Sequence, residues 1–190
     1  MIPADNSTVD SSSEDDAEIP ATGGVSPETA ARDIVEYLSR TGRQLALAES
    51  CTGGWVSQAV TAIPGASECF WGAVVSYANE AKTKALGVSP VILKEYGAVS
   101  AQTVRAMAAG ILTLSGADFS AAVSGIAGPG GGSPGKPVGT VWIGLASKNG
   151  TREEKLLSLK GTRRQIRETA TAGVLVALRR FAEEQNKVLP

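Results

Sequence analysis

ALAESCTGGWVS, residues 46–57, joins an apolar run to two glycines through a short polar segment. The run QLALA, residues 44–48, is typical of a buried strand, and the residues after Gly53 and Gly54 have apolar side chains at helical spacing. Short strands that alternate with helices are typical of an α/β fold. Because α/β sheets place ligand sites at the carboxyl ends of their strands, we expect a functional site at this connection.

The same alternation of helix and strand patterns continues along the rest of the chain. Helices are expected at 26–42, after Gly54, at 100–117 and in a long final segment capped by Thr162. Strands are expected at 44–48, 72–78 and 119–125, with an antiparallel pair at 139–147 and 152–160. This order predicts an α/β sandwich with a mixed sheet.

Composition favours one domain after an acidic segment. Residues 1–25 contain six Asp or Glu and no Lys or Arg, and we expect a disordered acidic tail there. The expected single domain, 26–190, then carries 18 basic and 13 acidic residues, about +5. A mildly cationic body suits an anionic small molecule, and its scattered basic residues do not indicate nucleic-acid binding.

Hydropathy gives no reason to expect a membrane protein. No apolar run reaches the length of a membrane helix, and acidic, Ser-rich sequence follows Met1 in place of a signal peptide. We therefore expect a soluble cytoplasmic protein without a membrane partner. Cys51 and Cys69 are expected to be free thiols, because disulfides are rare in that compartment.

The chain contains no histidine, and this absence restricts the chemistry. It excludes Ser-His-Asp and Cys-His-Asn nucleophile systems and every His-ligated metal site. Ser50 is the first candidate nucleophile and Cys51 a rival that the following helix could activate. The alternative is structural, with Ser50 or Thr52 as a helix cap and Cys51 as a small packing residue.

SYANEAKTK, residues 76–84, offers the groups that could replace histidine as a base. Tyr77 is expected at the end of a strand, and Lys82 at the start of the next element, near the same edge of the sheet as Ser50. A lysine acts as a base only when it is neutral, so a catalytic Lys82 must be desolvated. The alternative is a solvated Lys82 paired with Glu80 or another carboxylate.

Two further stretches suggest ligand binding. Residues 124–139, SGIAGPGGGSPGKPVG, match neither GxGxxG nor the Walker pattern, but a long irregular loop between strands favours a loop that embraces a substrate. Arg163, Arg164 and Arg167 lie at the start of the last helix, where the helix dipole disfavours cations. An anion bound by these arginines and by the amides of Gly161 and Thr162 would resolve that conflict, although a solvated basic face is the alternative.

Several blocks, read in order, resemble a known family. They are AESCTGG (48–54), SYANEAK (76–82), GAVS (97–100), SGIAGPGGG (124–132), KPVGTVW (136–142) and GTR (161–163). The chain is similar over roughly residues 27–185 to the CinA carboxyl-terminal family, whose active members are nicotinamide mononucleotide deamidases of the PncC type.

The resemblance implies a three-layer α/β/α fold and hydrolysis of a nicotinamide carboxamide to a carboxylate with release of ammonia. It implies Ser50 as nucleophile, assisted by Lys82 and Tyr77, with no cofactor and no metal. The expected substrate-binding residues are Thr52, Gly53, Gly54, Asn79, Ser124, Gly125, Arg163 and Arg164, with Arg167 as a weaker candidate. The expected partners are a pyridine nucleotide substrate and, as in relatives, further copies of the chain in a homo-oligomer.

Two other classes of function stay open at this point. One is a catalytically inactive nucleotide-binding or regulatory module on the same fold, suggested by the glycine-rich loop and the arginines. The other is a phosphatase or pyrophosphatase, which is disfavoured because no carboxylate cluster suited to Mg²⁺ stands out.

Overall fold

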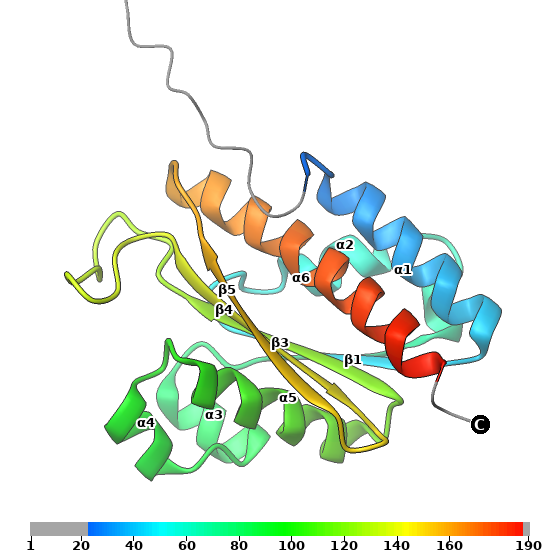
Figure 1. The fold of residues 1–190 in the computed structure, drawn as a ribbon, viewed down its shortest axis with the longest axis horizontal. Helices are drawn as coiled ribbons and strands as arrows, with labels where there is room; N and C mark the ends of the chain where they lie inside the picture. Colours follow the sequence, from blue (N-terminus) through cyan, green and yellow to red (C-terminus); the bar gives the residue numbers. More distant parts are fainter. Residues whose placement is uncertain (1–22, 188–190) are drawn as a thin grey trace, which may run out of the picture.

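The computed structural model describes residues 23–187, which form a five-stranded mixed sheet between two layers of helices (Figure 1). The expected α/β/α sandwich is therefore confirmed. Residues 1–22 of the expected acidic tail lie outside the described residues. Among residues 23–187, no helix combines the length and the apolar character needed to cross a bilayer.

The sheet has the strand order β2-β1-β3-β4-β5. The strands are β1 (Leu45–Glu49), β2 (Phe70–Val75), β3 (Phe119–Gly125), β4 (Thr140–Ser147) and β5 (Arg152–Ser158). β1 pairs in parallel with β2 and β3, whereas β3, β4 and β5 are antiparallel neighbours. The carboxyl ends of the three parallel strands thus meet at one edge of the sheet.

Helices cover both faces of this sheet (Figure 1). On one face lie α1 (Pro27–Thr41), α2 (Trp55–Thr61) and α6 (Arg163–Asn186), and on the other lie α3 (Asn79–Leu86), α4 (Pro90–Tyr96) and α5 (Ala101–Ser115). A short 3₁₀ turn, η1 (Ala66–Glu68), precedes β2. The predicted caps are confirmed, since Ser26 accepts a hydrogen bond from the Thr29 amide and Thr162 forms a capping box with Gln165.

Side-chain size differs between the two faces of the central strand. Leu45 and Leu47 point to the core beneath α1 and α6, and Ala46 and Ala48 point to the core beneath α5. Small residues let α5 lie close to the sheet, because a helix can approach only as far as the intervening side chains allow. The alternation within β1 therefore places large side chains in the core beneath α1 and α6 and small side chains in the core beneath α5.

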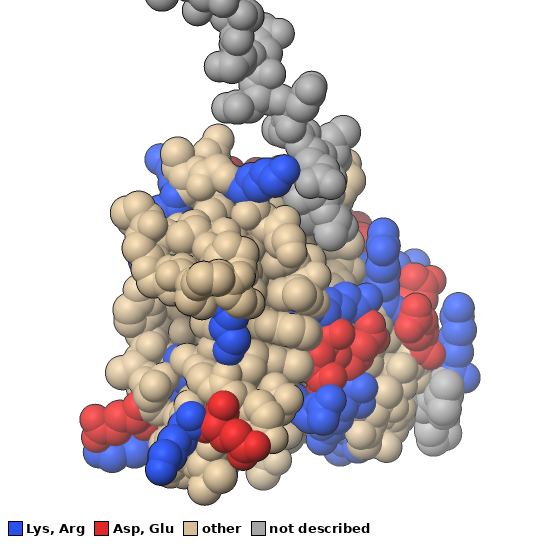
Figure 2. All heavy atoms as spheres, turned by 60° about the vertical axis from the view of Figure 1, so that its left-hand side comes forward, with Lys and Arg blue, Asp and Glu red and all other residues tan. Residues whose placement is uncertain are grey.

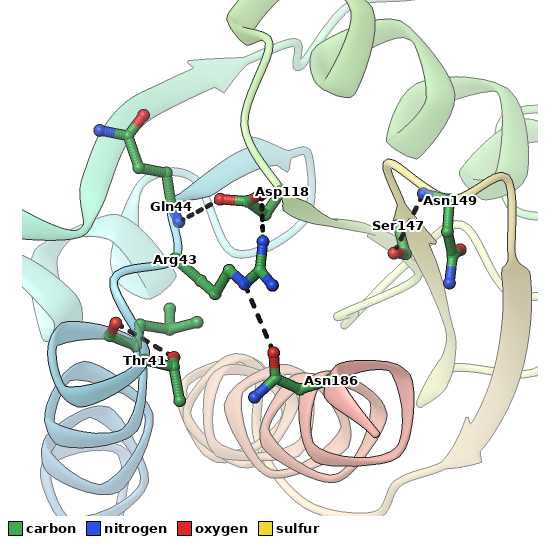
Figure 3. Close-up of polar contacts among 8 residues, drawn as sticks. Thr41, Arg43, Gln44, Asp118, Ser147, Asn149 and Asn186 are labelled. Carbon is green, nitrogen blue, oxygen red and sulfur yellow. Dashed lines mark hydrogen bonds and ion pairs between the residues drawn. The ribbon is translucent and has the colours of Figure 1, made fainter. Parts of the chain in front are cut away.

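The end of the sheet opposite the expected site is closed by polar contacts (Figure 3). Asp118 accepts a hydrogen bond from the Gln44 amide at 2.9 Å and pairs with Arg43 at 3.4 Å. Arg43 Nε also donates to the Asn186 side chain at 3.4 Å, so the entry to β1 is tied to the end of α6. This carboxylate anchors the amino ends of β1 and β3, far along the strands from Ser50.

One expected strand needs correction, and three short elements were not expected. The strand expected at 72–78 runs from Phe70 to Val75, so Tyr77 lies two residues beyond it. The chain turns there because the following segment begins α3, which holds Lys82. The short helices α3 and α4 and the turn η1 were not assigned from the sequence, because helices of seven or eight residues show too few turns for a clear periodicity.

Candidate active site

A cavity of about 190 Å³ opens at the carboxyl ends of β1 and β3. It is lined by Ser50, Cys51, Tyr77, Lys82, Ala98, Val99, Ser124, Gly125, Ala127 and Arg163. Figure 2 shows the side of the molecule on which the glycine-rich loop lies, and the upper and central parts of this face are mostly uncharged, with scattered Lys and Arg. A polar cavity at this edge agrees with the general position of ligand sites in α/β folds.

Ser50 and Lys82 meet inside this cavity. Lys82 Nζ lies 3.0 Å from Ser50 Oγ, although the residues are 32 positions apart in the chain. Nζ also donates to the backbone carbonyl of Ser76 at 2.7 Å and contacts that of Tyr77 at 3.4 Å. Lys82 is only 1% exposed, so the alternative of a solvated lysine paired with Glu80 is wrong; Glu80 pairs instead with Lys84.

Burial changes the protonation of both candidate side chains next to Ser50. Desolvation lowers the pKa of Lys82 below its usual value of 10.5, which favours the neutral amine that a base requires. Desolvation raises the pKa of Cys51 to about 12, against a smaller lowering effect of nearby backbone amides. The Cys51 thiol is therefore neutral near pH 7 and belongs to the apolar core beneath α1 and α2. Both Cys51 and Cys69 are free, as expected.

The phenol of Tyr77 is at the cavity mouth and not against the nucleophile. The residue is 64% exposed, and its hydroxyl oxygen accepts a hydrogen bond from Arg163 Nη2 at 3.2 Å. Its backbone carbonyl, and not its side chain, contacts Lys82. The structure thus places Tyr77 where it can meet the distal part of a ligand, with no hydrogen bond from its phenol to Ser50 or Lys82.

Three of the expected substrate contacts lie outside the cavity lining. Thr52 is fully buried and donates its hydroxyl proton to Glu49 at 2.7 Å, outside the cavity. Gly53 and Gly54 have φ of 60° and 95°, in the left-handed region that favours glycine. Neither glycine lines the cavity, and their positive φ values allow the sharp turn of the backbone between β1 and α2.

The remaining expected contacts divide between the cavity and the surface. Ser124 and Gly125 line the cavity, and Ser124 Oγ donates to the Ala98 carbonyl at 2.8 Å. A Cβ at Gly125 would lie 2.7 Å from Val141 Cγ2, so that position has no room for a side chain. Asn79 is exposed as the first residue of α3 and lies outside the cavity lining.

The three arginines of α6 occupy three different environments. Arg163 lies at the cavity mouth, where it donates to the Gly128 carbonyl at 2.8 Å and to Tyr77. Arg164 lines a separate depression of about 430 Å³ between α1, α2 and α6. Arg167 donates to the carbonyls of Cys51 at 3.1 Å and Thr52 at 2.6 Å, so its guanidinium is already engaged by the turn.

An anion site built from the free amides at the start of α6 is not supported. The Thr162 amide donates to Gln165 Oε1 at 2.8 Å within the capping box, and that bond uses one of the two amides, those of Gly161 and Thr162, that were expected to bind the anion. The acceptor is the helix's own glutamine, a normal partner for this position. Arg163 is the one arginine of the cluster that lies on the cavity.

The glycine-rich loop between β3 and β4 borders the cavity. Ala127 contributes to the lining, and Gly128 holds Arg163 through its carbonyl oxygen. Farther along the loop, Lys136 Nζ donates to the Tyr96 carbonyl at 2.8 Å, which ties the loop to the end of α4. The loop is therefore tied to both α6 and α4 by hydrogen bonds.

Glu49 is the residue that sequence analysis missed. Its carboxylate is 1% exposed and accepts four hydrogen bonds from the segment that follows it. The available signal was an acidic residue at the end of an otherwise apolar strand, since a buried carboxylate requires several partners. Glu49, and neither Ser50 nor Thr52, caps α2.

Comparison with known proteins identifies the family. The model of the CinA C-terminal domain matches residues 27–182. The chain is 48% identical over 164 residues to a CinA-like protein of Akkermansia muciniphila and 43% identical over 164 residues to one of Thermotoga neapolitana. These matches cover 84% and 86% of this chain, but only 39% and 40% of those proteins.

Solved structures share the same fold. The competence/damage inducible protein CihA from Agrobacterium tumefaciens superimposes with a TM-score of 0.78 at 40% identity, covering 80% of this chain and 93% of that one. A CinA superfamily protein from Klebsiella pneumoniae superimposes with a TM-score of 0.81 at 33% identity, covering 84% and 99% of the two chains. This chain belongs to the CinA C-terminal domain family.

Proposed function

We propose that this chain is an amidohydrolase that converts nicotinamide mononucleotide to nicotinate mononucleotide and ammonia. The observation that carries the proposal is the buried Ser50–Lys82 pair, with 3.0 Å between Oγ and Nζ, inside a cavity. The family membership supports the substrate class. The chain covers about two fifths of the curated relatives, so activities of those longer proteins are not assigned to it.

The carbonyls around Lys82 orient its amine. A neutral amine has two N–H bonds and one lone pair. When the carbonyls of Ser76 and Tyr77 accept the two N–H bonds, the lone pair is left to face the third neighbour, the Ser50 hydroxyl. Lys82 can then accept the Ser50 proton as Oγ attacks the carboxamide carbon.

The reaction then follows two steps. In the first, the Ser50 Oγ–carbon bond forms, the carbon–nitrogen bond breaks, and the proton held by Lys82 goes to the nitrogen that leaves as ammonia. In the second, Lys82 accepts a proton from water, the hydroxide attacks the acyl carbon, the bond from that carbon to Ser50 Oγ breaks, and Oγ takes the proton from Lys82. The product acid then releases its proton to solvent and leaves as nicotinate mononucleotide. Both steps conserve charge and use the same base.

Substrate charge is complementary to the site. The pyridinium makes the carboxamide carbon more electrophilic, and its positive charge disfavours a proton on Lys82. The anionic 5′-phosphate would reach the cavity mouth, where Arg163 is the cation that lines it. Arg163 would exchange its bonds to Gly128 and Tyr77 for the phosphate oxygens, since a guanidinium binds phosphate through paired N–H donors.

Ammonia release from nicotinamide mononucleotide by the purified chain is the decisive assay. We expect turnover that persists in a chelator, because the proposed steps need no metal ion, and a loss of about a thousandfold or more in Ser50→Ala and Lys82→Ala. A Ser50→Ala variant as active as the wild type would disprove the nucleophile. Calorimetric binding of the nucleotide without turnover would favour the inactive binding module.

Self-association also remains a proposal. Light scattering behind size-exclusion chromatography measures the molar mass in solution, which we expect to be at least twice that of the 19.4 kDa chain. A mass equal to one chain at assay concentration would reject a homo-oligomer.

A further inference from the structure

The carboxylate of Glu49 collects the hydrogen-bond donors of the segment that carries Ser50. Its Oε2 accepts from Thr52 Oγ1 at 2.7 Å, the Gly54 amide at 2.9 Å and the Val56 amide at 3.2 Å. Its Oε1 accepts from the Ser57 amide at 2.8 Å. A carboxylate at the amino end of a helix is stabilised by the helix dipole as well as by these bonds.

The other amides of the turn also have acceptors. The Ser50 amide donates to the Val123 carbonyl, the Gly53 amide to Ser50 and the Trp55 amide to Thr52. The early amides of α2 therefore already have acceptors within the fold and are not free to bind an anion. The amides that follow the nucleophile directly, those of Cys51 and Thr52, face the Cys51 sulfur, where burial raises the pKa of the thiol and these two amides act to lower it by a smaller amount.

A cation also contacts the same turn. Arg167 of α6 donates to the carbonyls of Cys51 and Thr52, and its guanidinium stacks 4.0 Å from the centre of the Trp55 ring. Glu49 thus binds donors of the turn and Arg167 binds its acceptors. Together these two charged side chains fix the path of the backbone between Ser50 and the start of α2.

We propose that Glu49 is the positioning residue of the nucleophile, which holds the Ser50 turn so that Ser50 Oγ stays within hydrogen-bond distance of Lys82 Nζ. The proposal rests on the nucleophile assigned above, but it does not depend on the identity of the substrate. Its energetic reason is that a displacement of about 1 Å in a reacting group can cost about a hundredfold in rate.

The test uses a sulfonyl fluoride, which needs no natural substrate. Ser50 Oγ attacks sulfur, fluoride leaves, and the hydroxyl proton goes to the Lys82 amine, so the rate of labelling reports the position of the pair. Labelling at Ser50 is followed by mass spectrometry in wild type and in Glu49→Gln. Asp118→Asn is the matched control, because this carboxylate also accepts a backbone amide, at the far ends of β1 and β3 (Figure 3).

We expect the rate of Ser50 labelling in Glu49→Gln to be at least about tenfold lower than in the wild type. The rate is measured at a temperature where circular dichroism shows that the variant is folded. Its kcat for ammonia release should fall by a similar factor with KM nearly unchanged. Asp118→Asn should be labelled at the wild-type rate, even if its melting temperature falls as far as that of Glu49→Gln. Wild-type labelling of folded Glu49→Gln would overturn the proposal.

Thr52→Val provides a second variant if Glu49→Gln does not fold. It removes one of the four bonds to Glu49 with little change in volume, and we expect labelling to slow about threefold. A wild-type rate in Thr52→Val would then overturn the proposal. Labelling of wild-type Ser50 without ammonia release would reject the substrate and support the positioning role, whereas no labelling of Ser50 would reject the nucleophile and this inference with it.

Discussion

Gly110 of α5 lies directly against the backbone carbonyl of Leu86 in α3, and a Cβ built at Gly110 would overlap that oxygen. Because α3 also carries Lys82, the close approach of these helices sets the depth at which the lysine enters the site. We predict that Gly110→Ala lowers the stability by about 1–3 kcal/mol, the usual cost of overpacking, and lowers kcat.

Gly135→Ala is the control for this prediction, because its Cβ would meet no atom within 4 Å. Chemical denaturation and ammonia release are measured on both variants. Equal stability of Gly110→Ala and Gly135→Ala would show that α3 can move away without cost.

Replacement of Cys51 should leave the chemistry in place. Burial keeps the thiol protonated, with a pKa of about 12, so it cannot act as the nucleophile near pH 7. We predict that kcat of Cys51→Ala stays within about threefold of the wild type, whereas Ser50→Ala loses about a thousandfold or more. Loss of ammonia release in Cys51→Ala with retained folding would instead assign the nucleophile to Cys51.

The rate should rise with pH as Lys82 loses its proton. Desolvation lowers the pKa of Lys82 below 10.5, so the active, neutral form is reached at a lower pH than for an exposed lysine. We predict that kcat/KM increases with pH and reaches a plateau below pH 10.5. The profile is measured from about pH 6 to pH 10. A profile that rises only above about pH 10 would mean that Lys82 titrates like a solvated lysine.

Lys82 should also make stability depend on pH. Since the folded pKa is lower than the unfolded one, the unfolded chain binds more protons between these two values, and stability rises with pH across that window. We predict that inactive Lys82→Met gains melting temperature relative to the wild type near pH 6, and that this gain shrinks as the pH approaches 10.5. A gain that is independent of pH would contradict a lowered pKa.

Arg163 and Arg164 should differ in their effect on substrate affinity. Arg163 lines the cavity mouth, whereas Arg164 faces a separate depression. We predict that Arg163→Ala raises KM for nicotinamide mononucleotide about tenfold with little change in kcat, because removal of a charged hydrogen bond costs about 1.5–3 kcal/mol. Arg164→Ala is the control and should change KM less than about twofold. Equal effects would place the phosphate between both side chains.

Much of the fold is local in origin and could be predicted for that reason. The caps at Ser26 and Thr162 act within one helical turn, so the sequence is enough to place them. The apolar strands β1, β3 and β4 were also recognisable. The limits of β2 were not, because Tyr77 has strand propensity and only the turn into α3 removes it from the sheet.

Ser50 and Lys82 could be proposed as a pair from the missing histidines and the family blocks, but their contact could not. Neutrality of Lys82 depends on burial, and burial depends on how α3 packs against α5 and the sheet. In the same way, the three arginines look equivalent in the sequence. Packing places only Arg163 on the cavity and uses Arg167 to hold the nucleophile turn.

By itself, the sequence determined the fold class, the family and the residue types available for catalysis, because these depend on periodicity, composition and short spacings. Only the tertiary structure decided which side chains meet and which are desolvated. Hydrogen bonds such as those of Glu49 and the 3.0 Å contact between Lys82 and Ser50 depend on distances in space, which the spacing of residues along the chain does not specify.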